Sequence, residues 1–295
     1  MSEFKIDFLG IGAEKAASYW IAHCLKEHPE VCFARNKEVF FFNEYDPHLL
    51  KVKNLKYQRG ISWYARQFPN CDKSQLKGEY SPTYLYGKEA AERIKKHFPD
   101  VKIIVCLRDP VKRAFSQYLH DRSIGLIKDI SFEEALKRQI SYFEKGLYFK
   151  HLKNYFSLFP KKNILVILIE DIKKDRKAVL KKIYKHVGAK NTNFQPKSLK
   201  TKPNVASQAR FYYLNYFLLH VEYVIKRNNL TWILRFLEKT GLRKLAFHVS
   251  YFINRKPLDK YPKMKRKTEE SLRNRYLSDI NKLEKLINRN LNSWK

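Results

Sequence analysis

A lysine, Lys15, lies in a loop of small residues that runs from Gly12 to Ser18, close to the start of the chain. An apolar run over residues 6–11 precedes this loop, and apolar residues at helical spacing follow it up to Lys26. A strand, a loop and a helix in this order form an anion site in α/β proteins, because free backbone N–H groups and the positive helix end face the ligand. The lysine adds a full positive charge. Since the Gly-Lys-Ser/Thr ending of a Walker A motif is absent, the segment predicts a phosphate site of another type.

Short apolar runs alternate with helical patterns over most of the chain before residue 200. The further expected strands cover residues 31–33, 78–81, 101–107 and 164–169, and the further expected helices cover residues 88–98, 132–142 and 149–159, with another helix starting near Val111. This alternation predicts an α/β fold with a parallel sheet, whose ligands bind at the carboxyl ends of its strands. Lys15 and Arg108 both lie at such ends. We therefore expect them to share one site.

The composition limits the architectures that the chain can adopt and the classes of molecule that it can bind. The 295 residues, 44% of them hydrophobic, suit one large α/β domain or one domain with an appended helical part. The chain has 60 Lys and Arg residues and 29 Asp and Glu residues, which gives a net charge of +31. This charge predicts attraction to polyanions or anionic membranes. The excess is spread along the chain, so a genome that encodes lysine-rich proteins in general explains it equally well. Both interpretations stay open.

The cysteines show neither a CxxC motif nor the Cys/His spacing of a zinc site. We expect reduced, buried thiols and no metal at Cys24, Cys32, Cys71 and Cys106. No signal peptide fits before Ile6, where a strand is expected to begin, and no uninterrupted apolar span of about 18 residues appears. The sequence therefore predicts a soluble, cytoplasmic protein.

Residues 206–254 differ from the rest of the chain, because aromatic residues crowd together there and basic helical patterns follow. One interpretation is a helical cap packed on the sheet. The other is an amphipathic segment that makes peripheral contact with a membrane interface. The chain closes with a charged helical pattern over residues 269–287.

Several segments resemble sulfotransferases that use 3′-phosphoadenosine 5′-phosphosulfate (PAPS). The sequence "GAEKAASYWIAHCLKEHPEV" from residue 12 resembles their 5′-phosphosulfate loop, and "VCLRDPVKRAFSQY" from residue 105 resembles their 3′-phosphate segment. The segments "KEVFFFN", "RGISWYARQFP" and "GEYSPTYLY" resemble the heparan sulfate branch of that family. The likeness extends over most of the chain and is weakest in residues 206–254.

This resemblance implies one sulfotransferase domain over residues 1–295 with a P-loop NTPase-like parallel sheet flanked by helices and an additional C-terminal helical region. The α/β core would cover residues 6–200, a helical cap or insertion residues 206–254, and a C-terminal loop and helix residues 255–295.

The resemblance also implies roles for the residues that bind PAPS. Lys15 would contact the 5′-phosphosulfate and stabilise the leaving phosphate, which is electrostatic catalysis. The backbone amides that would surround this group belong to Ala16, Ala17, Ser18 and Tyr19. Arg108 and Ser116 would bind the 3′-phosphate, whereas the alternative is that Arg108 pairs with a carboxylate such as Asp109.

Glu38 is the candidate general base, because the heparan sulfate branch has its catalytic glutamate here and the flanking phenylalanines would desolvate the carboxylate and raise its pKa. The alternative is a surface ion pair between Lys37 and Glu38. Several O-sulfotransferases carry histidine where this chain has Phe40, so the choice between O- and N-sulfation stays open.

Other positions depart from the family pattern. Ala17 replaces the usual glycine, and we expect a negative φ there because a Cβ atom disfavours positive φ. Tyr80 stands where many relatives have lysine. Lys260 and Tyr261 lie where relatives close a loop over the nucleotide; they are interpreted either as contacts to it or as a solvated turn.

The resulting hypothesis is transfer of the sulfuryl group from PAPS to a hydroxyl or amine of a carbohydrate, either a glycan, a polysaccharide or a glycolipid. An anionic acceptor, or one at a membrane, would suit the positive charge. Neither a metal nor a specific nucleic acid is expected as a partner. Two alternatives are a P-loop kinase that acts on a small molecule, and a basic protein that binds nucleic acid or membranes.

Overall fold

The computed structural model describes residues 4–46, 52–68, 71–127, 130–201 and 262–295, together with short stretches between residues 207 and 257. The chain forms two compact units. The first, here called the sheet unit, comprises Met1–Arg113, Leu147–Pro203 and Arg275–Lys295, and the second comprises Ala114–Gly146 and Asn204–Asn274.

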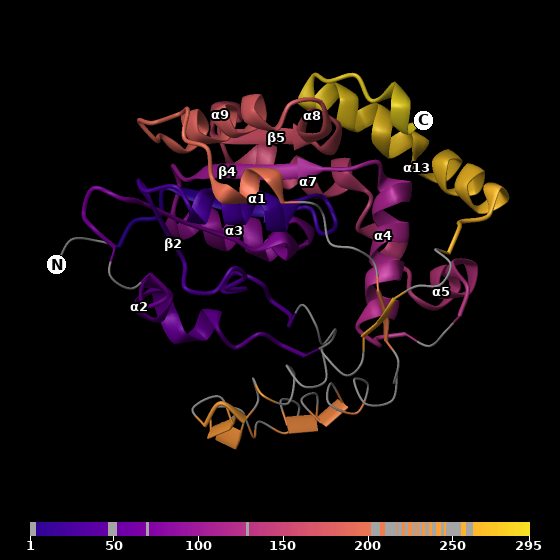
Figure 1. Ribbon diagram of the computed structural model, residues 1–295, viewed down its shortest axis with the longest axis horizontal. Helices are drawn as coiled ribbons and strands as arrows, with labels where there is room; N and C mark the ends of the chain where they lie inside the picture. The colour runs from indigo at the N-terminus through magenta and orange to yellow at the C-terminus, as the bar shows by residue number, and fades with distance from the viewer. Residues whose placement is uncertain are drawn as a thin grey trace. The chain divides into compact units, whose positions relative to one another are not determined.

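A five-stranded parallel sheet forms the core of the sheet unit (Figure 1). Its strands are β1 (Phe8–Gly12), β2 (Val31–Phe33), β3 (Leu76–Tyr80), β4 (Lys102–Leu107) and β5 (Ile164–Leu168), in the order β2-β3-β1-β4-β5. Every residue of β1 is buried, as are the last five residues of β4. Central strands of a parallel sheet are covered on both faces, which explains why they are continuous apolar runs. The predicted α/β fold is confirmed.

Helices follow the strands along the chain. In the sheet unit these are α1 (Ser18–Lys26), α2 (Gly60–Ala65), α3 (Lys88–His97), α7 (Tyr148–Leu158), α8 (Ile169–Lys174) and α9 (Arg176–Val187). Helix α1 packs against α9, and α3 packs against α7. The helices α4 (Pro110–Ser123) and α13 (Arg266–Ile287) each run from one unit into the other. The C-terminal end of the chain is fixed to the sheet unit, because Arg289 pairs with Asp171 at 2.8 Å and Trp294 is buried.

Several helical regions differ from the prediction. The helix expected over residues 132–142 is divided into α5 (Phe132–Arg138) and α6 (Ser141–Glu144), because Gln139 adopts an extended conformation and ends α5. The helices α2, α8 and α9 were not predicted. A signal for α9 is present in the sequence, since Asp175 caps its first turn through the Ala178 N–H at 3.0 Å and Gly188 ends it in the left-handed conformation.

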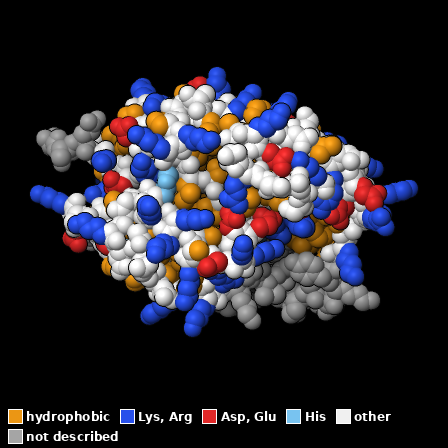
Figure 2. All heavy atoms as spheres, turned by 90° about the horizontal axis from the view of Figure 1, so that it is seen from above, with side chains coloured by type: hydrophobic (Ala, Val, Ile, Leu, Met, Phe, Trp, Pro, Cys, Tyr) orange, Lys and Arg blue, Asp and Glu red, His pale blue; other side chains and the backbone are white. Residues whose placement is uncertain are grey.

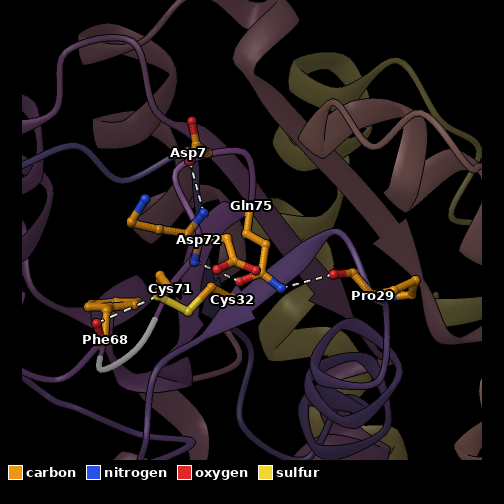
Figure 3. The surroundings of a disulfide bond; sticks show 8 residues. Asp7, Pro29, Cys32, Phe68, Cys71, Asp72 and Gln75 are labelled. Carbon is orange, nitrogen blue, oxygen red and sulfur yellow. Dashed lines mark hydrogen bonds between the residues drawn. A yellow bond between two sulfur atoms is a disulfide. The ribbon is translucent and has the colours of Figure 1, made fainter.

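A disulfide joins Cys32 on β2 to Cys71 in the segment before β3, with the two Cα atoms 5.5 Å apart (Figure 3). The prediction of four reduced thiols is therefore wrong for this pair. Pairing of β2 with β3 brings the two cysteines together, a proximity that a separation of 39 residues in the sequence does not reveal.

Cys24 and Cys106 are free and buried, and burial raises the pKa of the Cys24 thiol to about 12.

Loss of this disulfide is expected to destabilise the protein by about 3–4 kcal/mol, because the bridge closes a loop of 39 residues and restricts the unfolded chain. The variant is the double substitution Cys32→Ser and Cys71→Ser, and the measurement is urea-induced unfolding with and without reductant. Reductant should lower the stability of the wild type to that of the variant and leave the variant unchanged. Equal stability of the two proteins without reductant would contradict the expectation.

The second unit contains a short antiparallel ladder of β6 (Ser207–Ala209) with β7 (Arg255–Pro257), which lie at the two ends of the segment that spans residues 206–257. Within this segment, several described large apolar side chains are more than half exposed: Phe217, Trp232, Phe236 and Leu245. No helix among the residues that the structure describes is both long and apolar enough to cross a bilayer.

Candidate functional site

The connections of the sheet diverge between the carboxyl ends of β1 and β4. The chain leaves β1 toward β2 on one side of the sheet and leaves β4 toward β5 on the other, although β1 and β4 are neighbours. Ligands of open α/β sheets bind where two adjacent strands diverge in this way. The loop that carries Lys15 follows β1, and Arg108 follows β4.

The loop after β1 has an unusual backbone that presents the start of α1. Lys15 and Ala17 have φ angles of 64° and 61°, in the left-handed region that favours glycine. The expected negative φ of Ala17 is therefore wrong, because the turn from β1 into α1 decides its conformation over the preference of an alanine. Strained backbone of this kind clusters at ligand sites.

The N-terminus of α1 is suited to an anion. Within the described loop and helix, no side chain caps α1 and its first turn contains no acidic residue. The first N–H groups of a helix have no partner inside the helix and carry the positive end of its dipole. Of the residues expected there, Ala16 is buried, Ala17 and Ser18 are partly buried, and Tyr19 is half exposed with its ring in tilted contact with that of His23.

Arg108 reaches the lysine loop directly. Its Nη1 donates to the Lys15 carbonyl at 3.3 Å, and its own carbonyl accepts from the Tyr148 hydroxyl at 2.9 Å. The carboxylate of Asp109 caps α4, because it accepts from the N–H groups of Val111 and Lys112. The structure therefore brings Lys15 and Arg108 together at one edge of the sheet, as the sequence predicts.

Ser116 lies on α4, beyond the point at which the chain enters the second unit. Its position relative to Arg108 therefore stays a prediction. Lys260 and Tyr261 lie outside the described residues, and their proposed contact also stays a prediction.

Glu38 lies after β2 in residues 34–40, which form neither helix nor strand. Its carboxylate is 31% exposed and pairs with the Lys37 ammonium at 2.6 Å. The two residues that follow, Val39 and Phe40, are buried. This geometry contains the ion pair of the alternative interpretation and leaves the role of Glu38 as a base a prediction.

Sequence reasoning missed the buried polar groups behind these segments. Glu79 and Ser81, at the end of β3, are fully buried and contact the chain just after Glu38. The available signal was an acidic residue in the second half of a short strand, directly before an aromatic residue. Tyr86 accepts from the Glu14 N–H at 3.1 Å and so contacts the lysine loop.

The net charge does not by itself mark the site. Figure 2 shows Lys and Arg side chains spread over the described part of the face seen there, with acidic side chains scattered between them. The excess of +31 therefore does not gather over one element on this face. Both interpretations of the charge remain open.

The sequence matches the sulfotransferase domain family over residues 6–218. Among curated proteins, it is similar to the mouse heparan sulfate glucosamine 3-O-sulfotransferase 3B1, with 30% identity over 188 residues that cover 61% of this chain and 45% of that protein. It is also similar to the membrane-associated sulfotransferase kil1 of Dictyostelium discoideum, with 32% identity over 115 residues that cover 38% of this chain and 22% of that protein. The chain thus spans less than half the length of either relative.

Among solved structures, the fold is similar to that of a sulfotransferase from Alicyclobacillus acidocaldarius. The TM-score is 0.70, the sequence identity is 22%, and the alignment covers 99% of both chains. This likeness supports the P-loop NTPase-like arrangement of the sheet and its helices.

Proposed function

The chain belongs to the sulfotransferase domain family, and from this premise we propose that it transfers the sulfuryl group of PAPS to a hydroxyl or amine of a carbohydrate acceptor. The observation that carries the proposal is the contact between Arg108 and the Lys15 loop at the divergence of β1 and β4. It supports a donor with phosphate groups at two positions, since the Arg108 side chain contacts the loop that carries Lys15 and leads into the uncapped start of α1.

The donor is held at both of its phosphorylated ends. The start of α1 and Lys15 take the 5′-phosphosulfate, while Arg108 takes the 3′-phosphate, for which the planar guanidinium is well suited. Ser116 is proposed to donate its hydroxyl to the same phosphate. The 3′-phosphate distinguishes PAPS from ATP, so Arg108 determines the choice of donor.

The reaction is an in-line displacement at sulfur. The acceptor oxygen or nitrogen forms a bond to sulfur, the bond from sulfur to the phosphate oxygen breaks, and 3′-phosphoadenosine 5′-phosphate leaves with the electron pair. Glu38 takes the proton of the acceptor, and Lys15 stabilises the charge that accumulates on the leaving phosphate. No metal takes part, because positioning, a base and a stabilised leaving group are sufficient.

The acceptor is proposed to be a glycan, a polysaccharide or a glycolipid. Support comes from the similarity to a heparan sulfate sulfotransferase and from the positive charge, which attracts an acceptor that is already anionic. Peripheral contact with an anionic membrane belongs to the same proposal. The exposed apolar side chains between residues 217 and 245 support it.

We expect 3′-phosphoadenosine 5′-phosphate to bind about 10- to 100-fold more tightly than AMP, because a charge-assisted pair between Arg108 and the 3′-phosphate is made only by the former. Isothermal titration with both nucleotides and with ATP measures this ratio. Arg108→Ala should reduce this ratio, because it weakens binding of 3′-phosphoadenosine 5′-phosphate much more than binding of AMP. The matched control is Arg176→Ala, since Arg176 also donates to a backbone carbonyl but lies on α9.

Other results would contradict the proposal. Tighter binding of Mg²⁺ and ATP would support the kinase. Binding of nucleic acid or anionic vesicles without nucleotide affinity, with a steep salt dependence, would support a basic binding protein.

A further inference from the structure

We propose that the end of β3 contains positioning residues for both halves of the reaction: Tyr80 fixes the loop that carries Lys15, and Glu79 with Ser81 fixes the segment that carries Glu38. This inference rests on the proposed function for the roles of Lys15 and Glu38. The contacts that carry it belong to the sheet unit alone.

The pleat of β3 separates the two tasks. Successive side chains of a strand point to opposite faces, so Glu79 and Ser81 share one face and Tyr80 has the other. All three side chains are fully buried. The strand lies between β1 and β2, and the Ser81 N–H donates to the Gly10 carbonyl of β1 at 2.9 Å. The end of β3 is thus fixed to the strand that leads into the lysine loop.

Tyr80 holds the beginning of the lysine loop. Its ring occupies the space where a Cβ atom of Gly10 would lie, which explains why glycine is required there. Its hydroxyl donates to the Gly12 carbonyl at 2.5 Å, at the point where β1 ends and the loop begins. Water does not compete for this bond, because the phenol is fully buried. Where relatives have a lysine, this chain therefore has a support beneath the loop.

Glu79 and Ser81 hold the segment after Glu38. The Glu79 Oε2 atom accepts from the Val39 N–H at 3.3 Å and from the Ser81 hydroxyl at 2.6 Å. The Ser81 hydroxyl in turn accepts from the Phe40 N–H at 3.2 Å. Both backbone N–H groups that follow Glu38 thus bind to the end of β3.

The opposite side of this segment is also held. Lys56 donates to the Val39 carbonyl at 2.9 Å, and Asn54 donates to the Phe40 carbonyl at 2.5 Å. Phe40 has a φ of 57°, which is rare for a bulky residue and persists only where the surroundings determine it. The backbone next to Glu38 is therefore defined by side-chain hydrogen bonds on both sides.

The carboxylate of Glu79 is the centre of this support. Its Oε1 atom accepts from the hydroxyls of Tyr64 at 3.0 Å and Tyr84 at 2.7 Å. Burial raises the pKa of Glu79, although the surrounding donors favour its charged form. Such a network is costly to bury unless it is well satisfied, so its presence beside the candidate base indicates a positioning role.

Consecutive residues of one strand thus fix the donor loop and the base segment to the same rigid element. Transfer reactions depend on this relation, because a displacement of about 1 Å between the reacting groups can cost about 100-fold in rate. The two supports are separable, since each acts on a different face of β3. Substitution of one should disturb one half of the site and leave the other half intact.

Tyr80→Phe and Ser81→Ala test the inference, because each removes a single oxygen atom. Hydrogen exchange followed by mass spectrometry should show faster exchange of residues 12–18 in Tyr80→Phe and of residues 38–42 in Ser81→Ala. The matched control is Tyr184→Phe, in which a buried phenol also loses a hydrogen bond to a backbone carbonyl, that of Cys24. The control should leave both segments unchanged.

Kinetics should separate the two variants as well. Tyr80→Phe should weaken binding of 3′-phosphoadenosine 5′-phosphate about three- to tenfold, and Ser81→Ala should lower kcat by a similar factor with unchanged nucleotide affinity. Failure of the wild type to bind this nucleotide would overturn the proposed function, while the exchange experiment would still test the supports. Exchange patterns equal to those of the control would overturn the inference itself.

Discussion

Substitution of Lys15 by alanine is expected to lower kcat/KM about 100- to 1,000-fold. Removal of one group that stabilises the developing charge of a transition state costs about this much in other enzymes. The lysine lies in the loop between β1 and the start of α1, where backbone N–H groups already favour an anion. Its charge matters most when the bond from sulfur to oxygen breaks, because the leaving phosphate then gains negative charge.

Because the charge of Lys15 matters most in the transition state, a catalytic role can be distinguished from simple attraction of the donor. An interaction that strengthens in the transition state changes kcat more than the affinity for the product nucleotide. We therefore expect the loss in kcat to exceed the loss in affinity for 3′-phosphoadenosine 5′-phosphate, measured by sulfate transfer from labelled donor and by calorimetry. Lys88→Ala is the control for net charge, because Lys88 is exposed and pairs with Glu92 on the surface. Equal losses in kcat and affinity, or a loss shared by the control, would be incompatible with the catalytic role.

The sheet and the convergence of Lys15 with Arg108 were predictable from the sequence for one physical reason. Buried parallel strands are continuous apolar runs, and the residues that follow them must meet at one edge of the sheet. The contact from Arg108 to the Lys15 carbonyl confirms that inference. The family resemblance implied roles for Lys15 and Arg108, but it did not indicate which side chains pack around them.

What could not be predicted depends on contacts between segments that are distant in the sequence. The disulfide of Cys32 and Cys71 follows from the pairing of β2 with β3, and the φ of 61° at Ala17 follows from the path of the chain between β1 and α1. In both cases the tertiary structure overrides a local rule. The support by Glu79 and Ser81 is of the same kind, because hydrogen bonds across about 40 residues leave no periodic pattern.

Glu38→Gln should lower kcat about 100- to 10,000-fold, the contribution typical of a general base, with little change in the affinity for the product nucleotide. The amide keeps the shape of the side chain but cannot accept the acceptor's proton. The structure places Glu38 in an ion pair with Lys37 at 2.6 Å. The experiment therefore has to distinguish a base from a carboxylate that only forms a surface ion pair.

Lys37→Ala makes that distinction, because it breaks the same ion pair and leaves the carboxylate in place. A partly exposed pair contributes at most about 1 kcal/mol, so the effect of Lys37→Ala should stay within about fivefold if the pair matters only for stability. Sulfate transfer from labelled donor, measured for both variants under saturating donor, compares them. A large loss in Glu38→Gln with a small loss in Lys37→Ala identifies the carboxylate as the proton acceptor. Small losses in both would assign the pair to the surface and require another base for the reaction.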